Sequence, residues 1–320
     1  MDVGFDPDDP ASAFRLLMLG VAEGVKGALL TITAVIGGGP RAVGTHMAVL
    51  EDGRYCGHIS GGCIEAAVAS EAIVALRNGA DTTLRFGAGS RFVDIRLPCG
   101  GGLDVHVHVC PSPALMRQAL EGMSARRVFA LVVPALGHAP SLAWERAIGE
   151  RVHWADGQFI RPYHPMTRLV LIGAGYELEA MAAAGMALGY EVSVHLTALP
   201  RQGRETASIT AERHTATPES IRQARIDSYT AVALLLHDRE REDIYLRALL
   251  NYSPFYFGAL GSVNAHRKRI ERAAVSGLLM TSLAQIKAPI GSFGPARTAK
   301  TLAISVLADI AIRRMELDGC

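Results

Sequence analysis

The sequence predicts an α/β protein with a small N-terminal α+β domain and a C-terminal, Rossmann-like doubly wound parallel sheet. From Arg168 onward, short apolar segments alternate with helix-like ones, a pattern typical of parallel strands joined by helices. Before Arg168, strand-like segments follow one another through hairpin turns. A chain of 320 residues suits about two domains. We therefore expect residues 1–165 and 166–320 to form one domain each.

The N-terminal elements follow from hydrophobic spacing and turn residues. Apolar residues in 11–24 recur at helical spacing, and the β-branched run 29–36 is typical of a buried strand. Glu51-Asp52-Gly53 predicts a hairpin between strands over 46–50 and 54–59. The other elements expected here are helices over 64–77 and 113–122, strands over 82–86, 92–97, 103–109 and 128–133, and a hairpin around Asp156-Gly157.

The C-terminal elements begin after a proline-rich stretch. Arg161-Pro162-Tyr163-His164-Pro165 predicts an inter-domain linker, because proline interrupts both helices and strands. A strand over 169–172 then runs into a glycine turn and an alanine-rich helix that ends at Gly189. The elements expected after it are strands over 191–196, 231–236 and 256–260 and helices over 219–224, 243–250, 262–273 and 297–315.

Charge and cysteine content exclude several classes of protein. With 32 basic and 31 acidic residues, the net charge is +1, which provides no field for nucleic acid or an anionic membrane. No apolar run reaches the length of about 18 residues that a membrane span needs, and the acidic start is unlike a targeting signal. Five cysteines without a C-x-x-C pair argue against a disulfide scaffold and a structural zinc site. We expect a cytoplasmic protein with reduced thiols.

Glycine is concentrated in one part of the chain. Of 33 glycines, 14 lie between Gly37 and Gly102. Such a density predicts positive φ angles at tight turns or a close approach of the backbone to another group. Function is therefore expected in the N-terminal domain.

Two cysteines lie beside these glycines. Gly61-Gly62 precede Cys63 at the start of a predicted helix, where the helix dipole favours the thiolate. Glu65 follows in the first turn, and Cys99 precedes Gly100-Gly101 in a similar setting. The two alternatives are a shared site for both thiols and buried cysteines in glycine bends.

Three polar motifs each allow a binding interpretation and a structural one. Gly37-Gly38-Gly39-Pro40-Arg41 is either an anion-binding nest with Arg41 as counter-charge or a tight turn. His106 and His108 share one strand face as metal ligands would, but no third ligand has a useful spacing. We therefore expect a solvated face there and no metal site. His266-Arg267-Lys268-Arg269 is either a solvated helix face or a phosphate contact.

Gly173-Ala174-Gly175 lies between a predicted strand and a helix, as in a dinucleotide-binding turn. Leu178 occupies the position of the third glycine, where it would disturb close packing of the helix on the strand. The next strand ends at His195-Leu196 rather than at the acid that binds ribose. We expect an altered nucleotide-type site here. A purely structural turn and ordinary NAD(P) binding are the alternatives.

Short motifs of one family occur in order along nearly the whole chain. Those of the N-terminal half are Gly39-Pro40-Arg41-x-x-Gly44, Met47, Asp52-Gly53, Gly57-His58-Ile59-Ser60-Gly61-Gly62-Cys63-Ile64-Glu65 and Cys99-Gly100-Gly101. Those of the C-terminal half are 169–175, 189–192, His237-Asp238, Gly258 to Ser262, His266, Arg269, 288–291, 296–298 and 303–309. Together they resemble the XdhC/CoxI family, accessory proteins that mature molybdenum hydroxylases such as xanthine dehydrogenase.

The resemblance implies an accessory factor rather than an enzyme. Such a factor binds the molybdenum cofactor (molybdopterin), supports its sulfuration, and delivers it to an apo molybdenum hydroxylase. By position, Cys63, Cys99 and Glu65 are the candidate functional residues. The implied cofactor-binding residues are Gly38, Gly39, Arg41, Gly61, Gly62, Gly100, Gly101, Gly173 and Gly175. We expect a homodimer, a cysteine desulfurase as a further candidate partner, and no use of NAD(P).

The chain departs from the family pattern mainly in its C-terminal half. Leu178 replaces a glycine, Leu196-Thr197-Ala198 replaces an Asp-Pro-Arg, and Val263-Asn264 replaces an Arg-Arg pair. This pattern indicates a divergent member whose N-terminal site keeps the family role. Two alternative functions are an NAD(P)-dependent oxidoreductase and a non-catalytic scaffold that only docks a hydroxylase.

Overall fold

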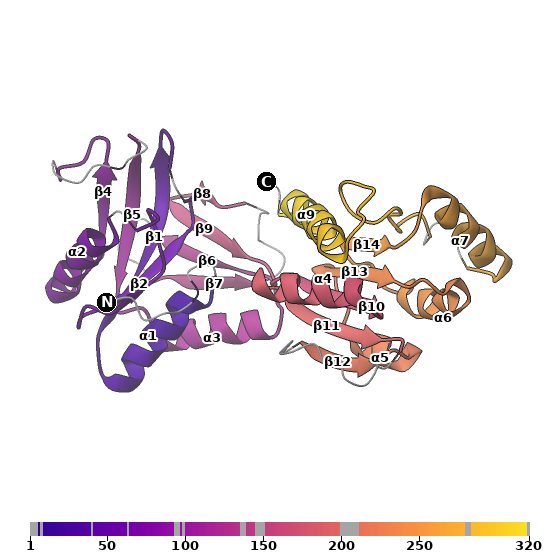
Figure 1. Ribbon diagram of the computed structural model, residues 1–320. Helices are drawn as coiled ribbons and strands as arrows, with labels where there is room; N and C mark the ends of the chain where they lie inside the picture. Colours follow the sequence, from indigo (N-terminus) through magenta and orange to yellow (C-terminus); the bar gives the residue numbers. More distant parts are fainter. Residues whose placement is uncertain are drawn as a thin grey trace. The chain divides into compact units, whose positions relative to one another are not determined.

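The structure consists of two compact units. The computed structural model describes residues 6, 9–39, 41–62, 64–92, 97, 100–134, 139–144, 151–198, 211–278 and 283–318. Contacts divide the chain into Met1–Pro165 and Met166–Cys320, called here the N-terminal unit and the C-terminal unit (Figure 1). No helix among the described residues combines the length and the apolar character that crossing a bilayer requires.

The N-terminal unit contains a five-stranded antiparallel sheet with the strand order β3-β2-β1-β5-β4 (Figure 1). Its strands are β1 (Gly27–Ile36), β2 (His46–Leu50), β3 (Tyr55–Cys56), β4 (Thr82–Gly87) and β5 (Gly102–Val109). The predicted hairpin joins β2 to β3, and Gly53 in its turn has a φ of 92°. Helix α2 (Glu65–Asn78) packs on one face of this sheet through Val68, Ala72 and Leu76.

A second antiparallel sheet completes the N-terminal unit. Its strand order is β7-β6-β9-β8, with β6 (Phe129–Pro134), β7 (Ser141–Trp144), β8 (His153–Ala155) and β9 (Gln158–Tyr163). Helices α1 (Ser12–Glu23) and α3 (Pro113–Ser124) share a core with this sheet and with β1 and β2. The largest side chains of that core are Phe14, Met116, Phe129, Phe159 and Tyr163. The first sheet is therefore buried on both faces at β1 and β2.

The predicted linker at 161–165 is wrong for its first three residues. Strand β9 continues through Pro162 to Tyr163, which pairs with Phe129 of β6. Strand β8 pairs with β9 only as far as Ile160. Pro162 therefore lies where β9 pairs with β6 but no longer with β8. On the side where β8 has ended, the missing N–H of proline costs no hydrogen bond.

The C-terminal unit is built on a parallel sheet with the order β12-β11-β10-β13-β14 (Figure 1). Its strands are β10 (Arg168–Gly173), β11 (Glu191–Leu196), β12 (Glu212–Thr215), β13 (Thr230–Leu235) and β14 (Tyr256–Ala259). Helices α4 (Tyr176–Ala187) and α9 (Ala299–Leu317) share one core with the sheet. Helices α5 (Pro218–Gln223), α6 (Arg239–Leu249) and α7 (Val263–Val275) share the other. The order reverses at β10, which confirms the predicted doubly wound sheet.

Leu178 does not disturb the packing of α4, contrary to the expectation from the glycine pattern. Its side chain is buried, with 2% exposed, in the core beneath α4 and α9. The close approach of α4 to the sheet occurs two turns later, at Gly185, where a Cβ would lie 2.8 Å from a methyl of Leu169. The small residue that allows this close contact is therefore at position 185 and not at position 178.

Two strands and one segment differ from the sequence-based expectation. Strands β7 and β12 were not predicted. The burial of β7 is only partial, and β12 is a mostly exposed edge strand of sequence ERHT, so neither carries a clear alternation of apolar residues. The strand expected over 92–97 lies mostly outside the described residues.

Candidate functional sites

Glu65 organises the loop that precedes α2. Its carboxylate accepts hydrogen bonds from the backbone N–H groups of Ile59 (3.1 Å), Ser60 (2.8 Å) and Ile64 (3.1 Å), and from the Ser60 hydroxyl (2.7 Å). Burial opposes ionisation, but the hydrogen bonds from Ser60 and from backbone N–H groups outweigh it and lower the pKa of Glu65. Glu65 is 2% exposed. It therefore acts as a buried anchor for the 59–64 loop, a role that differs from chemistry at an open site.

The loop that Glu65 holds carries Gly61 and Gly62 at the surface. Their φ angles are 80° and 103°, and added Cβ atoms would meet nothing within 4 Å. Glycine is required there by backbone conformation, and the space above both residues is open. Cys63, the next residue, lies outside the described residues, as do Pro40 and Cys99.

Two other glycine segments lie against each other. A Cβ on Gly101 would approach the carbonyl oxygen of Gly38 to 2.1 Å, and a Cβ on Gly37 would lie 3.6 Å from the Cα of Gly101. At Gly39 an added Cβ would meet a methyl of Val35 at 2.5 Å. Gly100 has a φ of 70° and open space around it. The close approach predicted from the glycine density is thus, for Gly38 and Gly101, an approach of backbone to backbone.

Arg41 lines a cavity of about 250 Å³ in the N-terminal unit. Arg161 and the polar residues Ser12, Thr45 and His46 contribute to its wall. The remaining lining residues are Asp9, Pro10, Ala13, Cys56 and Gly57. The cavity therefore combines two guanidinium groups with Gly57, the first residue of the family motif at 57–65.

Two residues of the cavity wall each have a buried side-chain atom without a hydrogen-bond partner among the described residues, Ser12 Oγ and His46 Nε2. The other ring nitrogen of His46 lies 2.9 Å from the Thr31 hydroxyl. Burial, with a smaller contribution from the nearby Arg161 charge, lowers the pKa of His46 to about 3, so the imidazole is neutral near pH 7. Arg161 lies over the Tyr163 ring, 3.7 Å from its centroid. Unsatisfied buried polar groups beside two cations are suited to a polar or anionic ligand.

The expected solvated face at His106 and His108 is wrong. His106 is 9% exposed, and the side chain of His108 is 13% exposed. A third residue, Asp81, joins them from the turn before β4, with its carboxylate 2.5 Å from the Nδ1 of His108. This acid has no local sequence signal, because it lies 25 residues before His106 and is brought beside it by the pairing of β4 with β5.

The C-terminal unit has a larger cavity, of about 850 Å³, beyond the carboxyl ends of its strands. Glu177 of α4, His237 after β13 and Ser262 after β14 lie on its wall, as do Phe293 and Arg297 of the segment before α9. This is the end of a doubly wound sheet at which ligands bind, and the volume is within the range of small-molecule sites.

Acidic side chains occupy the start of α4, where a dinucleotide phosphate would bind. Glu177 and Glu179 lie in the first turn, and a Cβ on Gly175 would be 3.6 Å from the Glu177 carboxylate. Gly173 approaches β13 so closely that a Cβ would lie 2.4 Å from the Leu235 carbonyl oxygen. Two carboxylates at this helix end repel a pyrophosphate and already interact with the dipole.

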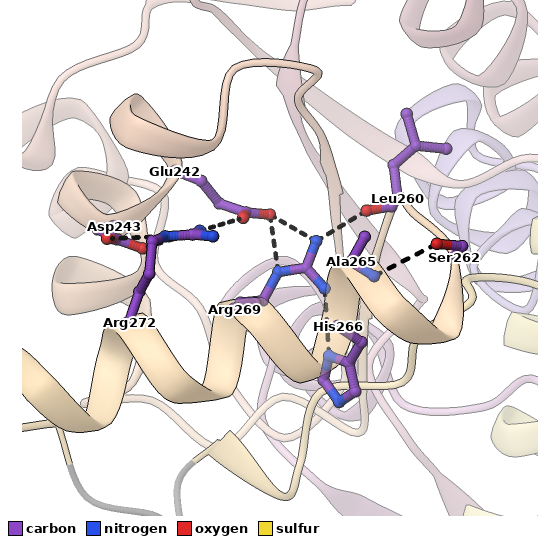
Figure 2. A network of polar contacts seen from close by, with 8 residues as sticks. All are labelled: Glu242, Asp243, Leu260, Ser262, Ala265, His266, Arg269 and Arg272. Carbon is purple, nitrogen blue, oxygen red and sulfur yellow. Dashed lines mark hydrogen bonds and ion pairs between the residues drawn. The ribbon is translucent and has the colours of Figure 1, made fainter.

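A buried polar network holds the start of α7 beside this cavity (Figure 2). Arg269 contacts the carboxylate of Glu242 and donates to the carbonyl of Leu260 at 2.7 Å. Its third contact is the Nδ1 of His266, at 3.1 Å. Arg269 is 3% exposed, so the solvated-face interpretation of the 266–269 run is wrong for this residue. The network fixes the Leu260 turn that lines the cavity.

Sequence reasoning missed several residues of these sites. Arg161, Ser12 and His46 were not predicted beside Arg41, and Glu242 was not predicted beside Arg269. Each partner lies in a different element of the chain, so only the packing brings them together. Arg161 was not predicted as a site residue because the prolines that follow it indicated an inter-domain linker.

Two family models match this chain, one in each half. A family model described as the XdhC and CoxI family matches residues 21–87, and one described as the XdhC Rossmann domain matches residues 169–310. The molybdenum cofactor insertion chaperone PaoD of Escherichia coli K12 is 36% identical over 318 residues, which is 99% of this chain and 93% of that protein.

Two further relatives are more distant. The uncharacterized protein YqeB of the same organism is 29% identical over 169 residues, 51% of this chain and 30% of that protein. A crystal structure described as a xanthine dehydrogenase from Bacillus halodurans has a TM-score of 0.74 at 20% identity, over 95% of this chain and 96% of that chain. This last similarity establishes the fold.

Proposed function

The chain belongs to the XdhC and CoxI family, and from that premise we propose that it is a molybdenum cofactor insertion chaperone. In this role it holds the cofactor as cargo and passes it to an apo molybdenum hydroxylase. The full-length similarity to a chaperone of that description supports the proposal. The cavity at Arg41 and Arg161 is the observation in this chain that carries it.

The chemistry of the cavity suits one end of the cargo. The cofactor is an anionic pterin dithiolene that carries a phosphate. Arg41 and Arg161 supply positive charge at the cavity wall, and guanidinium groups bind phosphate in a planar, bidentate manner. Ser12 Oγ and His46 Nε2 have no partner among the described residues and supply hydrogen bonds. We assign this cavity to the phosphate.

The molybdenum end is assigned to the thiols. Cys63 follows the Gly61-Gly62 turn, which is exposed. The Glu65 carboxylate accepts hydrogen bonds from the backbone N–H groups of Ser60, before this turn, and Ile64, after it. A soft thiolate is suited to molybdenum or to carrying sulfur, and Cys99 is proposed to share this role. Sulfuration would bring a cysteine desulfurase as a second partner, and the working form is proposed to be a homodimer.

NAD(P) chemistry is not part of the proposed function. The glutamates at the start of α4 disfavour a pyrophosphate on the turn at Gly173-Ala174-Gly175. The large cavity of the C-terminal unit is therefore proposed to take a ligand other than a dinucleotide.

The test is anaerobic binding of the molybdenum cofactor, followed by activation of a purified apo hydroxylase. We expect the wild type to retain cofactor, and Arg161→Gln and Cys63→Ala each to lower retention at least about tenfold, because each removes a charged or metal-binding contact. Arg117→Gln, on the exposed side of α3, and Cys110→Ala, an exposed free thiol, are the matched controls.

The outcome separates the alternatives. If wild type and variants all retain no cofactor, the proposal fails. If Cys63→Ala activates the hydroxylase as well as the wild type does, the docking-scaffold alternative is favoured over a role in holding the cofactor.

A further inference from the structure

Three metal-binding side chains converge at one end of the β4–β5 pair. His106 and His108 are two residues apart on β5 and therefore point to the same face of the sheet. Asp81 comes directly before β4, the neighbouring edge strand. The ligand atoms of the three residues all lie within 4.8 Å of one another.

One of these atoms is buried without a hydrogen bond to any described residue. His106 Nε2 has no hydrogen-bond partner in the described part of the chain, although His106 is 9% exposed. It faces the Oδ2 of Asp81 at 3.9 Å, too far for a hydrogen bond. The same oxygen lies 2.5 Å from the Nδ1 of His108. A buried nitrogen directed at a carboxylate across this gap lacks the partner that buried polar atoms normally have.

The outer contacts of the cluster orient its ligands. The Nδ1 of His106 lies 3.1 Å from the hydroxyl of Thr83, which leaves Nε2 as the nitrogen directed into the cluster. The second carboxylate oxygen of Asp81 accepts a hydrogen bond from the backbone N–H of Val109 at 2.8 Å. Such hydrogen bonds to the far side of each ligand are a regular feature of metal sites.

We propose that Asp81, His106 and His108 bind a divalent transition-metal ion of the zinc class. Two imidazoles and a carboxylate select such an ion over Ca²⁺ or Mg²⁺, which prefer oxygen ligands. Metal–ligand bonds of about 2.0–2.1 Å in a tetrahedral site place ligand atoms about 3.3 Å apart, and the 2.5 and 3.9 Å separations lie on either side of that value.

The location of the cluster defines its role. His106 follows Gly102 by four positions on β5, about 13 Å of strand, so the ion lies at the end of β5 away from the glycine segments. There it ties Asp81, directly before the edge strand β4, to the neighbouring strand β5. This makes it a stabilising clamp on the N-terminal unit, and none of its three ligands is among the residues that line the cavity at Arg41.

The experiment measures metal binding by the full-length chain without an affinity tag. After treatment with a chelator, the wild type is titrated with Zn²⁺, followed by calorimetry, and with Co²⁺, followed by its visible absorption. We expect one ion per chain at this site and a rise of the thermal midpoint on metal addition. Asp81→Asn and His108→Gln are expected to weaken that binding at least about tenfold and to remove the thermal shift.

Asp104→Asn is the matched control, because Asp104 is a carboxylate on the same strand that pairs with Arg85 instead. It is expected to bind Zn²⁺ as the wild type does. The proposal is overturned if the wild type shows no saturable binding, or if Asp81→Asn and His108→Gln bind the ion as tightly as Asp104→Asn. The wild-type titration requires no variant to fold, and none of its readouts depends on the chaperone function.

Discussion

Glu242 and Arg269 form an ion pair in which both side chains are buried, 2% and 4% exposed, with Nη2 of Arg269 2.8 Å from the carboxylate (Figure 2). Because Arg269 also donates to the Leu260 carbonyl, the pair joins α6 and α7 to the end of β14. A pair of this kind is costly to break from one side, since the remaining charge stays buried.

Arg269→Met is expected to lower the free energy of unfolding of the C-terminal unit by about 3–5 kcal/mol, measured by urea denaturation. The control is Arg267→Met, an exposed arginine on the same helix, for which a change within about 0.5 kcal/mol is expected. In the double variant with Glu242→Leu, much of the loss should return, because the buried carboxylate is then absent and Arg272, whose side chain is 30% exposed, keeps its contact with Asp243. Equal effects at both arginines would contradict a stabilising role for the pair.

Glu65→Gln is expected to lower the stability of the N-terminal unit by about 2–4 kcal/mol, since an amide cannot accept from all the donors that face the carboxylate. The pKa of Glu65 is lowered in the folded state. Its contribution is therefore present above the usual pKa of a glutamate and is lost as the pH falls through the folded value. Glu71→Gln, on the same helix and paired with Arg91 near the surface, should leave thermal denaturation nearly unchanged. Equal midpoints for the two variants would show that the loop does not depend on Glu65.

His46 is expected to make the stability of the N-terminal unit sensitive to acid. Its folded pKa of about 3 lies below the unfolded value of about 6.5, so the unfolded chain binds a proton first as the pH falls. Between those two pKa values, His46 alone should lower the free energy of unfolding by about 1.4 kcal/mol for each unit by which the pH falls. His46→Phe keeps an aromatic ring beside Phe14 and Tyr163 and should remove that part of the slope. Parallel urea titrations from pH 7 to pH 4 measure it, and identical slopes would refute the assignment.

Titration with NADH and NADPH, followed by nicotinamide fluorescence, should show no saturable binding in the micromolar range. The reason is repulsion between the pyrophosphate and the carboxylates of Glu177 and Glu179 at the start of α4. A dehydrogenase of known affinity provides the positive control. Saturable micromolar binding would instead favour the oxidoreductase alternative.

Much of the fold could be predicted because its signals are local. Glycine at 24 and 79 ends α1 and α2 in the left-handed conformation, and the hairpin turn at Gly53 is visible in three residues. Strand β12 could not be predicted, because an exposed edge strand of four polar residues is defined by its neighbour β11 rather than by its own pattern.

The candidate sites were predictable only in part, for a similar reason. Arg41 is visible in a motif, but its neighbour in the cavity, Arg161, follows it by 120 residues and reaches it through the second sheet. Leu178 was expected to disturb α4. The structure shows that a glycine two turns later provides the close contact instead.

The sequence by itself determined the alternation of elements, the turns, the doubly wound C-terminal sheet and the family. These depend on residues a few positions apart, whose spacing selects helix, strand or turn. Only the tertiary structure decided which distant side chains share a space. The pairing of β4 with β5 brings Asp81 to His106 and His108, and the packing of α6 beside α7 brings Glu242 to Arg269. Such contacts depend on strand register and helix packing, which are set by the whole core and not by any one segment.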